Sequence, residues 1–142
     1  KERNTMETKN PKVVVTELDV IRLEELLANM PADASLIKKR LLSELDRAEI
    51  VPSNEISSQV VTMNSTVRFL IVSKQEHFEY TLSYPQDVKD SSKQISILAP
   101  IGSALLGLSV GDEIEWPTPQ GLVKVVVEEV VYQPEHSGDF HL

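Results

Sequence analysis

Hydrophobic and polar positions follow two different periods along this chain. Between residues 16 and 50, apolar positions such as Leu23 and Leu27 recur every three or four residues, which is the spacing of one helix face. Beyond residue 60, apolar and polar residues alternate, as in the segment 77–84, which is typical of half-buried strands. The change of period predicts a helical segment followed by a β-rich one.

The helical segment predicts two short antiparallel helices joined by a turn. Thr16 or Asp19 can cap the first helix, and Pro31 ends it. The expected apolar stripe of this helix comprises Val20, Leu23, Leu27 and Met30, widened by Ile21 and Leu26. Asp33 or Ser35 can cap a second helix that runs to about residue 51. Its seam comprises Leu41, Leu45 and Ala48. Because helices of this length are marginal alone, we expect the base of the hairpin to pack on the remaining chain.

The β-rich segment predicts one mostly antiparallel sheet of about four to six strands. The expected strands lie within residues 60–72, 77–84, 93–99 and 122–133, with a further strand after residue 112. A short helix is expected to begin after Pro100 and to end at Gly107. His77 is interpreted as a turn residue. Helices that precede an antiparallel sheet indicate an α+β fold.

The amino-acid composition indicates a globular, acidic protein. The 142 residues include no cysteine, which removes thiolate catalysis and thiolate metal sites. Residues 1–50 hold nine basic and ten acidic residues, and residues 51–142 hold five and twelve, which gives the formal charge of −8. Nucleic acids are bound mainly through clustered Lys and Arg, so this acidic body argues against direct nucleic-acid binding. A protein partner with a basic surface fits better than a nucleic acid, but from charge alone the preferred interpretation is that the acidity keeps the domain soluble.

The candidate catalytic motifs are incomplete. Gly102 and Gly107 have the spacing of a phosphate-binding loop, but Leu108 occupies the position of the required lysine. Ser103 lies in a sequence that lacks the last glycine of a nucleophile elbow, because Leu105 replaces it. We therefore expect no catalytic residue and no cofactor.

Two further features are interpreted as structural. His136 and His141, with Glu135 and Asp139, could bind a divalent metal, but a solvated terminal segment is the better interpretation, and no metal site is expected. Trp116, the single tryptophan, is expected to pack at a strand end, and an anchor on a partner surface is the alternative.

Several separated segments resemble one family. Residues 94–121, read as QISILAPIGSALLGLSVGDEIEWPTPQG and followed by a strand, resemble the carboxy-terminal domain of the bacterial Gre transcript-cleavage factors. The similarity is closer still to the Rnk branch of that family, whose hairpin is short. The segments LLSELDRAEIV, QVVTMNSTVRF and YQPEHSGDFHL carry that likeness. It spans residues 12–142.

The resemblance implies a domain with an FKBP-like fold that docks on the outer rim of the RNA polymerase secondary channel. The Gre loop that touches polymerase corresponds to Leu98, Ala99, Pro100 and Ile101. Here the sequence departs from the Gre pattern, because Leu98 and Ala99 stand where an aspartate and a serine are common. An apolar loop can pack on a partner or belong to the core of its own domain, and the sequence leaves both interpretations open.

The hairpin tip would decide whether such a factor assists catalysis. The tip is predicted to comprise Asn29, Met30, Pro31, Asp33 and Ser35. Gre factors hold a second magnesium ion with two acidic residues three positions apart, as two-metal chemistry requires. This chain has Asp33 and then Leu36. The resemblance therefore implies a short arm that enters the channel without stimulating transcript cleavage, and Asp33 is interpreted as a helix cap.

The resemblance implies a regulator of transcription elongation that competes with Gre factors and affects nucleoside diphosphate kinase levels. We expect it to be cytoplasmic, monomeric and non-enzymatic. The alternatives are a direct regulator of nucleoside diphosphate kinase and an FKBP-like prolyl isomerase. The expected organisation comprises an extension (1–15), a hairpin (16–51), a connector (52–59) and a Gre-like domain (60–142). Residues 1–5 precede Met6 and could derive from outside the natural chain.

Overall fold

The computed structural model describes residues 12–30, 35–119 and 121–138, and for residues 35–37, 100 and 116–118 it describes the backbone. The helices are α2 (Glu17–Ala28), α3 (Ser35–Arg47) and α4 (Pro100–Leu105), with single turns η2 (Ser53–Glu55), η3 (Val72–Lys74) and η4 (Pro85–Asp87). The strands are β1 (Val14–Thr16), β2 (Glu49–Val51), β3 (Thr66–Ile71), β4 (Glu76–Ser83), β5 (Gln94–Ser96), β6 (Glu113–Thr118) and β7 (Gly121–Tyr132).

The main sheet has five strands in the order β5-β4-β3-β7-β6. Three of its strand pairs are antiparallel, but β4 and β5 run parallel. The sheet is therefore mostly antiparallel, as predicted, and the single parallel pair makes it a mixed one. The cause lies in the connection between β4 and β5, which contains η4 and brings the chain back to the start of β5 instead of reversing it in a tight turn.

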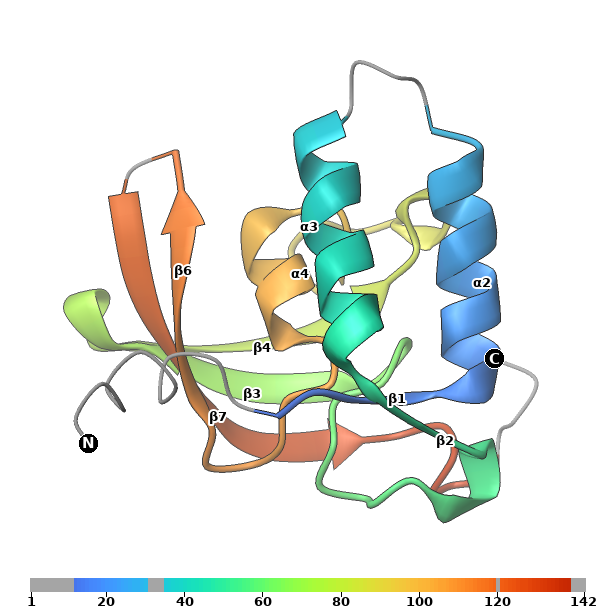
Figure 1. Cartoon of the computed structure of the whole chain (residues 1–142). Helices are drawn as coiled ribbons and strands as arrows, with labels where there is room; N and C mark the ends of the chain where they lie inside the picture. Colours follow the sequence, from blue (N-terminus) through green and yellow to red (C-terminus); the bar gives the residue numbers. More distant parts are fainter. Residues whose placement is uncertain (1–11, 31–34, 120, 139–142) are drawn as a thin grey trace, which may run out of the picture.

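A second, two-stranded sheet was not predicted. β1 and β2 flank the helical hairpin and pair in parallel, with Val15 opposite Ile50. The segment 49–51, which the apolar pattern assigned to the second helix, is therefore a strand, and α3 ends at Arg47. This pairing joins the two ends of the hairpin at its base, as Figure 1 shows.

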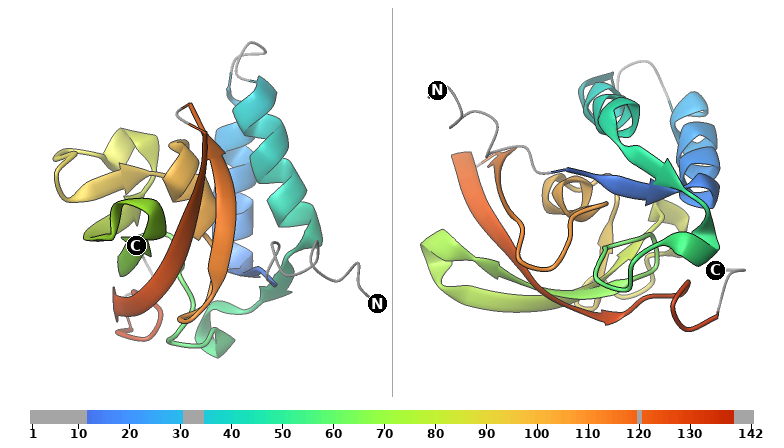
Figure 2. Two further views of the ribbon diagram at one scale, coloured as in Figure 1. Left: turned by 90° about the vertical axis from the view of Figure 1, so that its left-hand side faces the viewer. Right: turned by 60° about the horizontal axis from the view of Figure 1, so that its bottom comes forward.

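The remaining elements cover the concave face of the five-stranded sheet. In Figures 1 and 2, α4 lies between the sheet and the β1-β2 pair, and α2 and α3 rise side by side from that pair. β6 and the start of β7 extend away from the helices as a separate hairpin. The architecture is thus α+β, with the helices gathered on one face of the sheet.

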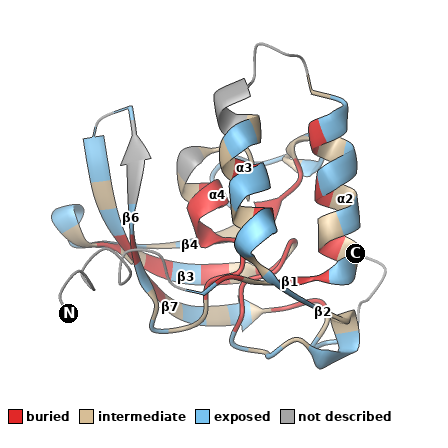
Figure 3. Ribbon diagram, in the orientation of Figure 1, coloured by how far each residue is buried: buried red, intermediate tan, exposed pale blue. Residues whose placement is uncertain are grey.

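One apolar core joins the helical hairpin to the sheet. Leu23 and Leu27 of α2, with Leu41 and Leu45 of α3, are buried in the same cluster as the sheet residue Phe69. Figure 3 shows the buried residues gathered where β1, α4 and the sheet meet. Burying a leucine side chain contributes about 1.5–3 kcal/mol, so the short helices gain their stability from this contact. The expected docking of the hairpin base is confirmed.

Local predictions for the helices hold in part. Thr16 is the N-cap of α2, and its hydroxyl accepts a hydrogen bond from the Asp19 backbone N–H at 3.1 Å. Ile21 does not widen the buried stripe, because 54% of its surface is exposed. Ser35 is the first residue of α3 and not its N-cap, and Asp33 lies outside the described residues.

The convex face of the sheet carries a row of charged side chains. Arg68 of β3 lies between Glu79 at 3.1 Å and Glu129 at 2.9 Å. His77 is a residue of β4, not of a turn, and its Nδ1 lies 2.8 Å from a Glu128 carboxylate oxygen. These contacts are exposed, so each contributes at most about 1 kcal/mol to stability.

The glycine-rich stretch has the structural roles that its sequence predicted. Gly107 has a φ of +82°, and a methyl group there would overlap a side-chain carbon of Val13 in front of β1. Its carbonyl oxygen accepts a hydrogen bond from the Val14 N–H at 3.1 Å. Gly107 thus closes the turn after α4 where β1 passes.

Across the described residues, no helix has the length and apolar character needed to cross a membrane.

Candidate functional site

The predicted partner loop lies between β5 and the start of α4. Leu98, Ala99 and Ile101 are each half-buried, and Leu98 and Ile101 pack against the core. Pro100 begins α4 as its first residue, where the fixed φ of proline suits the first helical turn. The loop therefore presents apolar side chains that are neither fully buried nor fully exposed.

Serine and glycine residues on both sides fix this loop. The Ser96 hydroxyl accepts a hydrogen bond from the Leu98 N–H at 3.0 Å, and the Ser103 hydroxyl donates one to the Ile97 carbonyl at 2.6 Å. Gly102 lets α4 approach β5, because a methyl group there would overlap the Ser96 carbonyl oxygen. Backbone contact on both sides gives the loop a defined shape.

The hairpin tip is described at its first two residues. Asn29 is the C-cap of α2, and its side-chain amide donates a hydrogen bond to the Glu25 carbonyl at 3.0 Å. Met30 packs partly against the core. Pro31 and Asp33 lie outside the described residues, and so does the side chain of Ser35. The tip assignment stays a prediction.

A buried carboxyl group fixes the base of the hairpin. Asp19 lies in the first turn of α2 and is 2% exposed. Its Oδ2 accepts a hydrogen bond from the Met63 backbone N–H at 3.0 Å, across 44 positions of sequence. An acidic residue three positions after an N-cap often bonds back to the cap itself. Here it reaches instead to the segment that leads into β3.

The carboxy-terminal end of the sheet joins the same region. The Thr62 hydroxyl donates to a Glu135 carboxylate oxygen at 2.8 Å and lies 2.7 Å from the Ser65 hydroxyl. The Gln133 side chain donates to the Ser57 and Val60 carbonyls at 2.7 and 2.8 Å. These bonds hold the chain after β7 against the connector before β3.

The electrostatic environment of this region is unusual. Burial raises the pKa of the Asp19 carboxyl to about 7, the nearby Glu135 carboxylate adds to the rise, and the Met63 hydrogen bond and Arg22 oppose it. Burial likewise raises the pKa of the Tyr84 hydroxyl, so that the phenol stays protonated at neutral pH.

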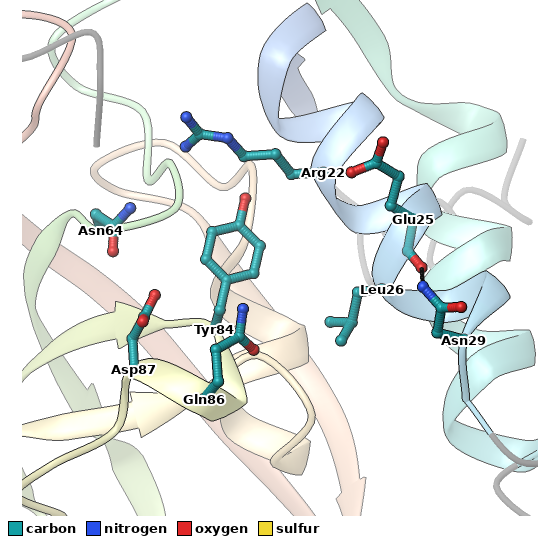
Figure 4. Close-up of a pocket in the computed structure, with 8 residues that line it drawn as sticks. All are labelled: Arg22, Glu25, Leu26, Asn29, Asn64, Tyr84, Gln86 and Asp87. Atoms are coloured by element: carbon teal, nitrogen blue, oxygen red, sulfur yellow. Dashed lines mark hydrogen bonds between the residues drawn. The ribbon is translucent and has the colours of Figure 1, made fainter.

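A cavity of about 720 Å³ opens between α2 and the sheet. One side comes from α2, through Arg22, Glu25, Leu26 and Asn29. The other side comes from Asn64 before β3 and from Tyr84, Gln86 and Asp87 at η4. Figure 4 shows these side chains around the space between the two layers. This volume lies within the usual range of ligand sites.

Two family models match consecutive parts of the chain. The model for the Rnk N-terminus matches residues 11–51, and that for the C-terminal part of the transcription elongation factors GreA/GreB matches residues 56–132. The regulator of nucleoside diphosphate kinase from Escherichia coli (strain K12) is 45% identical over 134 residues, which cover 93% of this chain and 98% of that relative. The chain belongs to the Rnk family of GreA/GreB relatives.

Other relatives of this Rnk-family protein include elongation factors. Transcription elongation factor GreA of Helicobacter hepaticus is 28% identical over 140 residues, covering 92% of this chain and 85% of the relative. A solved structure described as a prokaryotic transcription elongation factor GreA/GreB from Nitrosomonas europaea is 52% identical. It superposes with a TM-score of 0.68 and covers 87% of this chain and 100% of the solved one.

Sequence reasoning missed the buried polar groups of this Rnk-family protein. Asp19 was considered as an N-cap, and Glu135 as a residue of a solvated tail. One sequence signal was available, since an acid three positions after Thr16 is placed to bond inside a helix cap. Nothing local to Asp87 or Asn64 indicated the cavity, because its sides come from separate parts of the chain. Among the described residues, no group of three or more His, Asp or Glu residues could hold a metal ion.

Replacing Gly102 with alanine tests how the partner loop is supported. In an open helix, alanine is favoured over glycine by about 1 kcal/mol. Here the methyl group meets a backbone carbonyl that cannot turn aside, and we expect the free energy of unfolding to fall by roughly 1–3 kcal/mol in urea titrations. A variant that is more stable than the wild type would contradict the close contact between α4 and Ser96.

The Asp19 pKa predicts how stability depends on pH. Because the folded-state pKa is raised from 3.8 to about 7, the folded protein holds a proton that the unfolded chain releases above about pH 4. Stability is therefore greatest below that value and falls as pH rises through about 7. We expect the free energy of unfolding to fall by roughly 2–4 kcal/mol between pH 4 and pH 8 from this group.

Two substitutions isolate this contribution. Asp19→Asn keeps an oxygen that can accept from Met63 but cannot ionise, so urea titrations across this pH range should show a smaller fall. Asp46→Asn, on the exposed face of α3, is the control and should keep the wild-type fall. Equal pH dependence in the wild type and Asp19→Asn would contradict the assignment.

Proposed function

We propose that this protein is a regulator of transcription elongation that binds RNA polymerase and occupies its secondary channel in competition with Gre factors. The observation that carries this proposal is the partner loop, whose apolar Leu98 and Ile101 stay half-exposed although the backbone around them is fixed by hydrogen bonds. A rigid apolar loop of this kind suits a protein interface. The GreA/GreB relatives, which are named transcription elongation factors, supply the partner class.

The hairpin is proposed to enter the channel without stimulating transcript cleavage. At 1.5 Å per residue, the 12 residues of α2 give a helix about 18 Å long. The tip sequence provides Asp33 without a second acid three positions later, and two-metal chemistry needs a pair of ligating groups. The arm would therefore obstruct the channel and leave the polymerase active site unaided.

Several finer points accompany this proposal. The sheet domain would have the FKBP-like fold of Gre carboxy-terminal domains, and α2 and α3 would form a short coiled coil. The protein would act as a cytoplasmic monomer, and its effect on nucleoside diphosphate kinase levels would be indirect, through transcription. The packing expected of the Trp116 side chain lies outside the part of the chain whose side chains are described.

Binding to the matching core RNA polymerase is the direct test. We expect a Gre factor to displace the bound protein, and Pro100→Asp to weaken binding about tenfold because it places a charge in the apolar loop. Aspartate is tolerated in a first helical turn, so this variant should fold. Pro52→Asp makes the same change at the start of η2 and serves as the control.

Transcription assays provide the second readout. The protein should inhibit cleavage stimulated by a Gre factor and stimulate none itself. Unchanged Gre activity at saturating protein would count decisively against occupancy of the channel.

Direct regulation of nucleoside diphosphate kinase is the second candidate, favoured by the name of the Escherichia coli relative. Purified kinase assayed with and without this protein distinguishes the two. A change in turnover in the absence of polymerase would support direct contact, whereas we expect none.

A further inference from the structure

Two carboxylates line the cavity between α2 and η4. Glu25 lies on the helix side and Asp87 on the opposite side, as Figure 4 shows. Within the described part of the chain, neither carboxylate takes part in an ion pair or a side-chain hydrogen bond. Both side chains belong to a protein with a net charge of −8. Their negative potential favours a positively charged occupant.

The end of α2 adds to this negative potential. The carboxyl end of a helix carries a partial negative charge, which a basic residue in the last turn usually balances. The last turn of α2 contains no basic residue. Asn29 satisfies the Glu25 carbonyl instead, and that neutral amide leaves the charge at the cavity edge uncompensated.

The Tyr84 side chain forms part of the wall of the same cavity. The residue is 6% exposed, and its hydroxyl is fully covered. Arg22 is the charged group that acts on this hydroxyl, so the tyrosine contributes mainly its ring to the cavity wall. On the same side of the cavity, Asn64 has a φ of +68°, a left-handed conformation that asparagine adopts more readily than most residues.

Arg22 is the cation that lines this cavity. Its guanidinium is directed toward Tyr84 (Figure 4) and acts electrostatically on that hydroxyl and on the buried Asp19. Arg22 contributes one positive charge to a lining that also holds the two carboxylates, so the lining keeps a net negative charge. Glu25 and Asp87 remain as the charges that can meet an incoming group.

We propose that this cavity binds the side chain of an arginine from a protein partner. A guanidinium has five N–H donors in one plane, which suit carboxylates on two sides and amide oxygens such as those of Asn64 and Gln86. The net negative charge of the lining disfavours phosphate-bearing ligands. Identifying the partner as RNA polymerase rests on the function proposed above, whereas the chemistry of the site does not.

The site is tested first without any partner. The full chain is labelled with ¹⁵N and titrated with N-acetyl-arginine amide, and with N-acetyl-citrulline amide as the uncharged match. We expect saturable amide shifts at residues 25–29, 64 and 84–88 with the arginine compound and at least tenfold weaker binding of the citrulline compound. An N-acetyl-lysine amide titration shows whether the planar group or the charge alone is recognised.

Paired variants identify the residues responsible. Glu25→Gln combined with Asp87→Asn should weaken arginine binding at least tenfold. Glu24→Gln combined with Asp46→Asn removes the same charges from exposed positions outside the cavity and should change it less than twofold. Absence of shifts, equal binding of citrulline, or equal loss in both double variants would overturn the proposal.

Binding to core RNA polymerase then distinguishes a failure of this proposal from a failure of the function proposed above. If both hold, the cavity double variant should weaken binding to core RNA polymerase about tenfold or more, and the control variant should not. If the arginine compound binds but the wild-type protein does not bind polymerase, the proposed function fails and the cation site stands. If polymerase binds both double variants equally, its arginine does not occupy the cavity and the polymerase assignment is overturned.

Discussion

The hydrogen bond from the Met63 N–H to the buried Asp19 carboxylate is the interaction on which the arrangement of this protein depends. A hairpin of two short helices has little stability of its own, and its direction relative to the sheet must be set by contacts at its base. Apolar packing of Leu23 and Leu27 supplies attraction without direction. The Asp19 bond, together with the parallel pairing of β1 and β2, supplies the direction. This contact requires a buried carboxyl with a raised pKa. The attachment of the hairpin to the sheet is therefore sensitive to pH.

The attachment of the hairpin to the sheet determines how the partner loop and the cavity are arranged. The partner loop is fixed to the sheet through Ser96 and Ser103, and the cavity has one side on α2 and the other on η4. Because α2 is anchored beside β3, the two sides of the cavity keep a defined separation.

Much of this fold was predictable because its signals are local. Thr16 caps a helix, Gly107 closes a turn and the alternation in β4 indicates a strand, and each of these depends on a few neighbouring residues. The parallel β1-β2 pairing was not predicted, since three-residue strands carry too little periodicity and their partners lie 35 positions apart. His77 was assigned to a turn because its charged neighbours resemble loop residues, yet the convex face of the sheet is open to solvent and admits charged side chains. The residues of the partner loop and tip came from family resemblance, and physical pattern alone would not have selected Leu98 over any other apolar residue.

The cavity shows why function was harder to predict than fold. Glu25 and Asp87 are separated by 62 positions, and each alone is an ordinary surface acid. They become a site only because η4, in the same connection that makes β5 parallel to β4, carries Asp87 to the side of the sheet that faces α2. Two carboxylates that line one cavity, at the end of a helix without a basic last turn, favour a cationic occupant over an anionic one. That preference is the property expected of a surface that meets a basic partner.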